Sequence, residues 1–251
     1  MNPKLLDHPL ISTRYFFPRS SALSDPFMVE VDGAQLACWR SAPPSDRPVL
    51  LHFHGNGEVV SDWIDFFSRL GAQLGIDIFL AEYRGYGLST GSPALYTMLN
   101  DLEALSTAIG VPPEKVIVFG RSVGSIYALE WISRFPNTAG AIIESGIHDV
   151  HQRLRLRVDP EELGCAEDAF LSVVQQHFNH AQKLANYSKS TLFLHAQNDQ
   201  LVTVDHARAN AMSAQNGQLK VLPFGGHNDI LFANMSEYLN ALTTFIQSVI
   251  K

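Results

Sequence analysis

The segment Gly120-Arg121-Ser122-Val123-Gly124 constrains the fold more than any other part of this chain. An apolar run at 116–119 precedes it and a segment with helical spacing, 123–135, follows it, so the serine falls where a strand turns sharply into a helix. Such a turn needs a small residue two places before and two places after the serine, because a side chain there would collide with the neighbouring strand or helix. The pattern predicts a nucleophile elbow that exposes the serine hydroxyl.

Strand-like and helix-like segments alternate on both sides of this elbow. The pattern predicts a mostly parallel sheet with helices on both faces, which is an α/β fold. Asp32-Gly33 separates two further apolar runs, 28–31 and 35–39, and predicts a hairpin at an antiparallel edge. The expected strands are 49–53, 76–81, 115–119, 141–144, 192–195 and 219–222, and the expected helices are 61–71, 95–105, 123–135, 203–214 and 230–250.

The length and one interruption of the alternation predict the domain organisation. A chain of 251 residues with 46% hydrophobic content can bury one large core, so we expect a single domain over residues 1–251. Residues 147–190 contain no strand candidate, whereas Phe170, Val174, Phe178, Ala181 and Leu184 keep helical spacing. An insertion of this length above a sheet is typical of a lid, which would shape a substrate pocket.

Composition excludes several classes of protein. A formal net charge of −7 disfavours general binding to nucleic acid or anionic membranes. Cys38 and Cys165 are far apart and lack metal-ligand spacing, which indicates free thiols in a reducing compartment. We find neither a signal-peptide-like apolar core at the amino terminus nor an apolar run long enough to span a bilayer. The expectation is a soluble cytoplasmic protein without integral membrane association.

Two residues downstream of the elbow are candidates to activate Ser122. Serine is a weak nucleophile unless a base lies within hydrogen-bond reach and an acid orients that base. His227, in Gly226-His227-Asn228-Asp229, is the candidate base, and Asp199, just after the strand at 192–195, is the candidate acid. The order serine, acid, histidine is that of α/β-hydrolases. Glu144, at the end of an earlier strand, is the rival acid, whereas Asp205 and Asp229 are interpreted as helix-start carboxylates.

A tetrahedral intermediate needs backbone N–H groups that bind its oxyanion. Val123 follows the serine and is expected to supply one of these donors. The second is expected from His54-Gly55-Asn56-Gly57, the loop after the strand at 49–53, with the Asn56 amide favoured over that of Gly55.

Candidates for the substrate pocket are Tyr83, Arg84, Arg153, Phe170 and Phe178. Arg153 belongs to an alternation of arginine and leucine, Arg153, Arg155 and Arg157, that either binds a carboxylate or phosphate or forms a solvated helix face. Tyr83 and Arg84 either line the pocket or anchor the glycine-rich loop 83–93. The histidine pairs 148/151 and 177/180 have no accompanying carboxylate–histidine signature, so we predict no metal.

Together these motifs resemble those of α/β-hydrolase-fold serine hydrolases, and in particular the Bem46-like branch, which includes α/β-hydrolase domain-containing proteins of types 13 and 17. The resemblance covers residues from about 47 onward except the lid, and it does not extend to the first 25 residues or to 147–185. The chain departs from the usual pattern at His195-Ala196, where histidine-glycine is common, and lacks the proline common before that strand. The matching motifs are 52–57, 82–93, 120–124, Asp199 with Val202, and 226–229.

The resemblance implies acyl hydrolysis without a cofactor. The expected activity is that of a serine hydrolase that cleaves a carboxylic ester or thioester of a small-molecule or acylated substrate through an acyl-enzyme on Ser122. Some type 17 relatives remove fatty acyl groups from protein cysteines and carry an amino-terminal cysteine cluster, which this chain lacks. Two alternatives stay open: an acyltransferase with the same triad, and a noncatalytic binding protein on this fold. The sequence leaves the acyl chain, the leaving group and the oligomeric state open.

Overall fold

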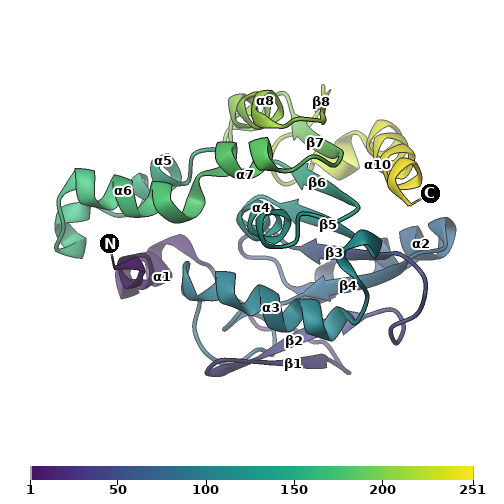
Figure 1. Ribbon diagram of the computed structural model, residues 1–251, viewed down its shortest axis with the longest axis horizontal. Helices are drawn as coiled ribbons and strands as arrows, with labels where there is room; N and C mark the ends of the chain where they lie inside the picture. The colour runs from purple at the N-terminus through teal and green to yellow at the C-terminus, as the bar shows by residue number, and fades with distance from the viewer. Residues whose placement is uncertain (1, 251) are drawn as a thin grey trace.

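A computed structural model describes residues 2–250, and its centre is an eight-stranded sheet (Figure 1). The spatial order of the strands is β1-β2-β4-β3-β5-β6-β7-β8. All pairs from β4 to β8 are parallel, so the carboxyl ends of these strands lie along one edge. The strands are β1 (Phe27–Val31), β2 (Ala34–Arg40), β3 (Val49–Phe53), β4 (Asp77–Ala81), β5 (Val116–Arg121), β6 (Gly140–Glu144), β7 (Thr191–Ala196) and β8 (Gly217–Leu222).

Two antiparallel strands close one side of the sheet, as the sequence predicts. β1 pairs with β2 across the Asp32-Gly33 turn, and β2 pairs antiparallel with β4. Gly33 has φ of +73°, a value that glycine adopts at little cost. The hairpin therefore forms where the turn residues predict it.

Helices cover both faces of the sheet, because strands β3 to β7 are buried along their whole length. α3, α4, α7 and α8 lie over one face, and α2 and α10 over the other (Figure 1). The α-helices are α1 (Pro9–Tyr15), α2 (Ile64–Leu74), α3 (Thr97–Ile109), α4 (Gly124–Arg134), α5 (Val150–Arg155), α6 (Glu167–Phe178), α7 (His180–Asn186), α8 (Val204–Ser213), α9 (Ile230–Ala233) and α10 (Met235–Val249); the 3₁₀ helices are η1 (Pro3–Asp7), η2 (Val60–Asp62), η3 (Pro113–Lys115) and η4 (Pro160–Leu163).

One expected helix is divided in two. The segment 230–250 forms α9 and α10, because the Asn234 side chain donates hydrogen bonds to the carbonyl oxygens of Phe224 and Ile230 and so ends the first helix. The loop that precedes α9 carries His227 and is held at Phe224 by the same asparagine.

Residues 147–190 form α5, η4, α6 and α7. The helical spacing from Phe170 to Leu184 is interrupted at Asn179, whose side chain accepts a hydrogen bond from Gln182 N–H and begins α7. α7 packs against α4, whereas α6 extends toward the amino-terminal helices (Figure 1). The prediction that this insertion acts as a lid remains a prediction.

The amino-terminal residues, to which the sequence assigned no structure, form η1 and α1 beside α6 (Figure 1). Asp7 accepts hydrogen bonds from the N–H groups of Tyr96 and Thr97 at the start of α3. Arg14 forms a two-pronged ion pair with Glu162, at 2.7 and 3.0 Å. These contacts hold the amino-terminal segment between α3 and the insertion.

Candidate active site

Ser122 occupies a strained turn between β5 and α4. Its φ is +52°, a left-handed conformation that residues with a side chain seldom adopt. A Cβ added at Gly120 would lie 2.6 Å from the Ala128 Cβ, and one added at Gly124 would lie 2.1 Å from the Phe53 carbonyl oxygen. Both flanking glycines are therefore required by close packing against α4 and β3, as the elbow pattern predicts.

Loops from three neighbouring strands bring Ser122, His227 and Asp199 together. Ser122 follows β5, Asp199 follows β7, and His227 follows β8. His227 Nε2 lies 2.8 Å from Ser122 Oγ, and His227 Nδ1 lies 2.7 Å from Asp199 Oδ2. The three side chains form one continuous hydrogen-bonded chain.

Asp199 is a buried carboxylate whose oxygens are both hydrogen-bonded. Its Oδ1 accepts from the N–H groups of Leu201 and Val202, each at 2.9 Å, and its Oδ2 lies 3.3 Å from His195 Nε2. Burial alone would raise the pKa of the Asp199 carboxyl, but hydrogen bonds from His195 and His227 hold it below its usual range. An ionised Asp199 only accepts, so Nδ1 of His227 carries a proton and Nε2 of a neutral imidazole is free to accept one from Ser122.

Glu144, the rival acid, lies in a different set of contacts. Its carboxylate lies 3.0 Å from Arg121 Nε and accepts a short hydrogen bond from the Tyr238 hydroxyl. Burial raises the pKa of Glu144, with Arg121 and Tyr238 acting in the opposite direction. Because Asp199 occupies Nδ1 of His227, the geometry favours Asp199 over Glu144 as the orienting acid.

Arg121, whose role the sequence did not indicate, links three parts of the site. Its guanidinium contacts Glu144, lies 2.5 Å from Glu58 Oε1, and donates a 2.7 Å hydrogen bond to the His227 carbonyl oxygen. Its side chain is only 5% exposed, and the two carboxylates keep its pKa raised despite burial. Arg121 therefore fixes the histidine loop relative to β6 and to the loop after β3. No motif or spacing in the sequence pairs Arg121 with Glu58 and Glu144, which are far from it along the chain and come together only in the fold.

The two favoured oxyanion donors are available, and the third is not. Within residues 2–250, the N–H groups of Asn56 and Val123 donate no hydrogen bond, and both residues line the cavity at Ser122. The Gly55 N–H instead donates to Glu58 Oε2 at 2.7 Å. The expectation for Gly55 is therefore wrong, because the carboxylate that pairs with Arg121 also accepts its N–H.

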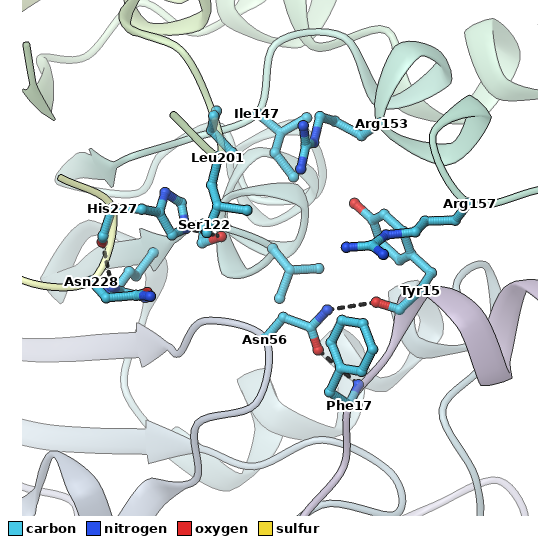
Figure 2. Close-up of a pocket in the computed structure, with 13 residues that line it drawn as sticks. Tyr15, Phe17, Asn56, Ser122, Ile147, Arg153, Arg157, Leu201, His227 and Asn228 are labelled. Atoms are coloured by element: carbon cyan, nitrogen blue, oxygen red, sulfur yellow. Dashed lines mark hydrogen bonds between the residues drawn. The ribbon is translucent and has the colours of Figure 1, made fainter. Parts of the chain in front are cut away.

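The Asn56 side chain holds the amino-terminal segment against this loop. Asn56 Nδ2 donates to the Tyr15 carbonyl oxygen, and Oδ1 accepts from Phe17 N–H at 2.9 Å (Figure 2). The same Oδ1 accepts from the Tyr86 hydroxyl at 2.7 Å. The segment that passes over Asn56 thereby becomes one wall of the cavity. Neither periodicity nor a motif marks residues 15–17, so the sequence did not indicate this wall.

A cavity of about 210 Å³ opens above Ser122 (Figure 2). Arg153 lines it, as expected, together with Tyr15, Phe17, Ile147, Arg157 and Leu201. The other expected pocket residues, Tyr83, Arg84, Phe170 and Phe178, do not line this cavity. The residues that line the cavity come from the amino-terminal segment, the loop after β3, the elbow, the start of the insertion and the loops after β7 and β8.

Four expected pocket residues are structural instead. Tyr83 is buried and donates to the His54 carbonyl oxygen at 2.7 Å. Arg84 forms a two-pronged ion pair with Asp101, at 2.5 and 2.7 Å, and donates to the Asp32 carbonyl oxygen, which anchors the glycine-rich loop. Phe170 and Phe178 pack in the apolar core under the insertion, where helical spacing turns them inward.

The histidine pairs form separate contacts. His148 Nδ1 lies 2.9 Å from Asn210 Oδ1, His151 pairs with Glu167, and His180 Nδ1 contacts the Ile147 carbonyl oxygen. Among residues 2–250, no group of three or more histidine, cysteine, aspartate or glutamate side chains is placed to hold a metal ion. Over the same residues, no helix has the length and apolar character that crossing a bilayer requires.

Comparison with known proteins agrees with this architecture. A family model described as serine aminopeptidase, S33 (Hydrolase_4) matches residues 44–167, which include the elbow. Among curated proteins, α/β-hydrolase domain-containing protein 17C of Xenopus laevis is 28% identical over 86% of this chain and 71% of its own length. Its mouse counterpart is 30% identical over 81% of this chain and 61% of its own length. The chain is similar to these α/β-hydrolase domain-containing proteins and has the α/β-hydrolase fold.

Solved structures show the same fold for this α/β hydrolase. The esterase Est1E from Butyrivibrio proteoclasticus, solved with ferulic acid, superposes with a TM-score of 0.74 at 18% identity, over 89% of this chain and 99% of that one. The esterase RhEst1 from Rhodococcus gives a TM-score of 0.66 at 19% identity, over 88% and 98% of the two chains. The chain spans about three fifths of the length of the mouse relative.

Proposed function

We propose that this α/β hydrolase is a serine hydrolase that cleaves carboxylic esters or thioesters through an acyl-enzyme on Ser122. The observation that carries the proposal is the hydrogen-bonded chain from Asp199 through His227 to Ser122, beside two unengaged backbone donors. Esterase neighbours on the same fold and relatives named as α/β-hydrolase domain-containing proteins support it.

Acylation begins when Ser122 Oγ attacks the acyl carbonyl carbon. His227 Nε2 accepts the hydroxyl proton as the new bond forms, and the resulting imidazolium is stabilised by the Asp199 carboxylate. The N–H groups of Asn56 and Val123 donate to the developing oxyanion, which such donors stabilise by about 2.7–4 kcal/mol each. His227 then donates the proton from Nε2 to the leaving alcohol or thiol, and the bond to the leaving group breaks.

Deacylation repeats these steps with water as the nucleophile. His227 Nε2 takes a proton from water as the hydroxyl attacks the acyl carbon, and His227 then passes that proton to Ser122 Oγ as the bond between Oγ and the acyl carbon breaks and the acid is released. Over the cycle the Ser122 proton departs with the leaving alcohol or thiol and a proton from water replaces it, so the three residues end in their starting protonation states. The proposed chemistry therefore requires no cofactor.

A fluorophosphonate probe and a series of p-nitrophenyl esters of graded chain length test the proposal. We expect the probe to label Ser122 in the wild type and not in Ser122→Ala, with ester turnover lost in the same variant. Asn228→Ala serves as a matched control, because Asn228 lines the same cavity outside the hydrogen-bonded chain. Labelling that is absent from the wild type would instead favour a noncatalytic binding protein.

An acyltransferase with the same triad is distinguished by its products. Competing alcohols and amines are added to the ester assay, and the products are analysed by mass spectrometry. A hydrolase releases free acid as the main product at every acceptor concentration, whereas a transferase accumulates the new ester or amide.

A further inference from the structure

Three arginines and no acidic residue line the cavity at Ser122. Arg153 and Arg157 both line it, and none of its lining residues is aspartate or glutamate. The third lining arginine, Arg121, is already paired with Glu58 and Glu144. In a chain with a formal charge of −7, this local excess of positive charge is opposite in sign to the molecule as a whole.

The two arginines differ from the arginine between them. Arg155 pairs with Glu167 at 3.1 Å and with Asp159 at 3.6 Å, and it is not among the residues that line the cavity. Within residues 2–250, neither Arg153 nor Arg157 forms an ion pair or a side-chain hydrogen bond with a carboxylate. The alternation at the start of the insertion therefore separates one structural arginine from two that face the catalytic serine.

Both guanidinium groups lie near the amino-terminal wall of the cavity. The Arg157 guanidinium carbon lies 5.6 Å from the centre of the Phe17 ring, an arrangement that aromatic rings stabilise. Burial raises the pKa of Tyr15 to about 12, and the charges of Arg153 and Arg157 act in the opposite direction because they lie close to its hydroxyl. Arg153, Arg157 and the Tyr15 hydroxyl thus form a cluster of hydrogen-bond donors.

This cluster lies on the acyl side of the proposed reaction centre. Figure 2 shows Arg153, Arg157 and Tyr15 on the opposite side of Ser122 from His227. His227 must protonate the leaving group, so the leaving group lies beside the imidazole and the acyl group extends the other way. A group bound by the arginines therefore belongs to the acyl part of the substrate.

We propose that Arg153 and Arg157, assisted by Tyr15, bind an anionic group at the distal end of the acyl chain, which makes this a hydrolase of acidic acyl esters. This inference rests on the proposed function. Guanidinium groups bind carboxylates and phosphates through paired, charge-assisted hydrogen bonds, and a cavity wall with no competing acid favours that use. Dicarboxylic acid half-esters have the required chemistry, as do acyl groups that end in a phosphonate.

The test compares charged and neutral esters of equal length. The substrates are p-nitrophenyl half-esters of glutaric, adipic and suberic acid, the ω-methyl esters of the same compounds, and the p-nitrophenyl ester of 5-phosphonovaleric acid. We expect the wild type to have a higher kcat/KM for a half-ester than for its methyl ester. The phosphonate arm identifies which anion the site prefers.

Substitution of the arginines should remove this preference. In Arg153→Gln/Arg157→Gln, the ratio of kcat/KM for the charged ester to that for the neutral ester is expected to fall about 10- to 100-fold, as expected for lost charge-assisted hydrogen bonds. Arg155→Gln is the control for each single substitution, Arg153→Gln and Arg157→Gln, because it removes one positive charge from the same segment but outside the cavity, and its ratio should equal that of the wild type. A wild-type ratio near one, or an unchanged ratio in the double variant, overturns the inference.

A binding measurement separates failure of this inference from failure of the proposed function. Calorimetry with adipate is carried out on Ser122→Ala and on Ser122→Ala/Arg153→Gln/Arg157→Gln, neither of which needs turnover. Adipate binding that only the first protein shows supports the anion site even if no ester is cleaved. Ser122-dependent cleavage of neutral esters without adipate binding refutes the anion site and leaves the proposed function intact.

Discussion

Replacement of Arg121 by methionine should destabilise the protein by leaving a buried carboxylate without its partner. Glu144 is 1% exposed, and Arg121 supplies its cationic partner at 3.0 Å. Removal of one member of a buried ion pair costs about 3–5 kcal/mol in free energy of unfolding. Glu58 adds less, because its side chain is 21% exposed and still accepts from Gly55 N–H and Trp63 Nε1. For a chain of this size the change corresponds to a fall in Tm of roughly 6–20 °C.

The loss in free energy of unfolding caused by Arg121→Met should be larger at high pH than at low pH. Burial already raises the pKa of Glu144, and loss of Arg121 removes an effect that opposes the rise. A carboxyl group whose folded-state pKa exceeds its unfolded value, about 4.3, stabilises the fold at low pH and loses that contribution as the pH rises through the folded pKa. Arg121→Met should therefore be less destabilised, relative to the wild type, at pH 5.5 than at pH 8.

Urea unfolding at both pH values measures these differences. Arg121→Met/Glu144→Gln should recover much of the lost stability, because the carboxylate without a partner is gone. Arg134→Met is the matched control: its guanidinium is 24% exposed, and its pairing with Glu130 should be worth no more than about 1 kcal/mol. A loss below about 1 kcal/mol at pH 8 in Arg121→Met, or no recovery in the double variant, refutes the reasoning.

Three further substitutions test other parts of the site. Asp199→Asn should lower kcat by about 10⁴-fold in an ester assay, because the amide can donate to His227 Nδ1 and favours the wrong tautomer. The pKa of Asp199 is lowered in the folded protein, so its carboxylate stabilises the wild type above about pH 3.9, and this contribution is lost as the pH falls further. Asp199→Asn lacks the contribution at every pH. Gly124→Ala should lower Tm sharply in a thermal melt, because the new methyl would lie 2.1 Å from the Phe53 carbonyl oxygen, whereas Gly226→Ala, with its nearest atom at 3.7 Å, should not. Asn56→Ala removes three hydrogen bonds to Tyr15, Phe17 and Tyr86, so amide exchange at 15–19 should accelerate; unchanged exchange would show that other contacts hold this segment.

Much of the fold was predictable because local patterns and topology agree. Apolar runs of strand length predicted the parallel strands. The glycines around Ser122 predicted the elbow, because only glycine fits against α4 and β3 at those positions. The breaks at Asn179 and Asn234 were not predicted, because a side chain that ends a helix does not alter hydrophobic spacing. The alternation of strands and helices also placed the loops that carry Asp199 and His227 at one edge.

The pocket was harder to predict than the triad. The residues of a triad follow a fixed order along the chain, so a sequence motif can identify them. The residues that line a pocket depend on how distant segments pack, which no local motif records. Arg84 and Arg153 look alike in sequence, yet one finds a carboxylate in Asp101 and the other does not. Tyr15 and Phe17 carried no signal at all, because their place in the cavity depends on a hydrogen bond with Asn56.

The double use of Asn56 restricts how this cavity can change. Its main chain carries an N–H that we propose as an oxyanion donor, and its side chain tethers the wall formed by residues 15–17. Any mutation or partner that shifts this wall pulls on the residue that would polarise the carbonyl. A change in the substrate selectivity of the cavity should therefore also change the rate of the reaction. Variants that enlarge the cavity by replacing residues 15–17 need a new hydrogen-bond partner for the Asn56 side chain.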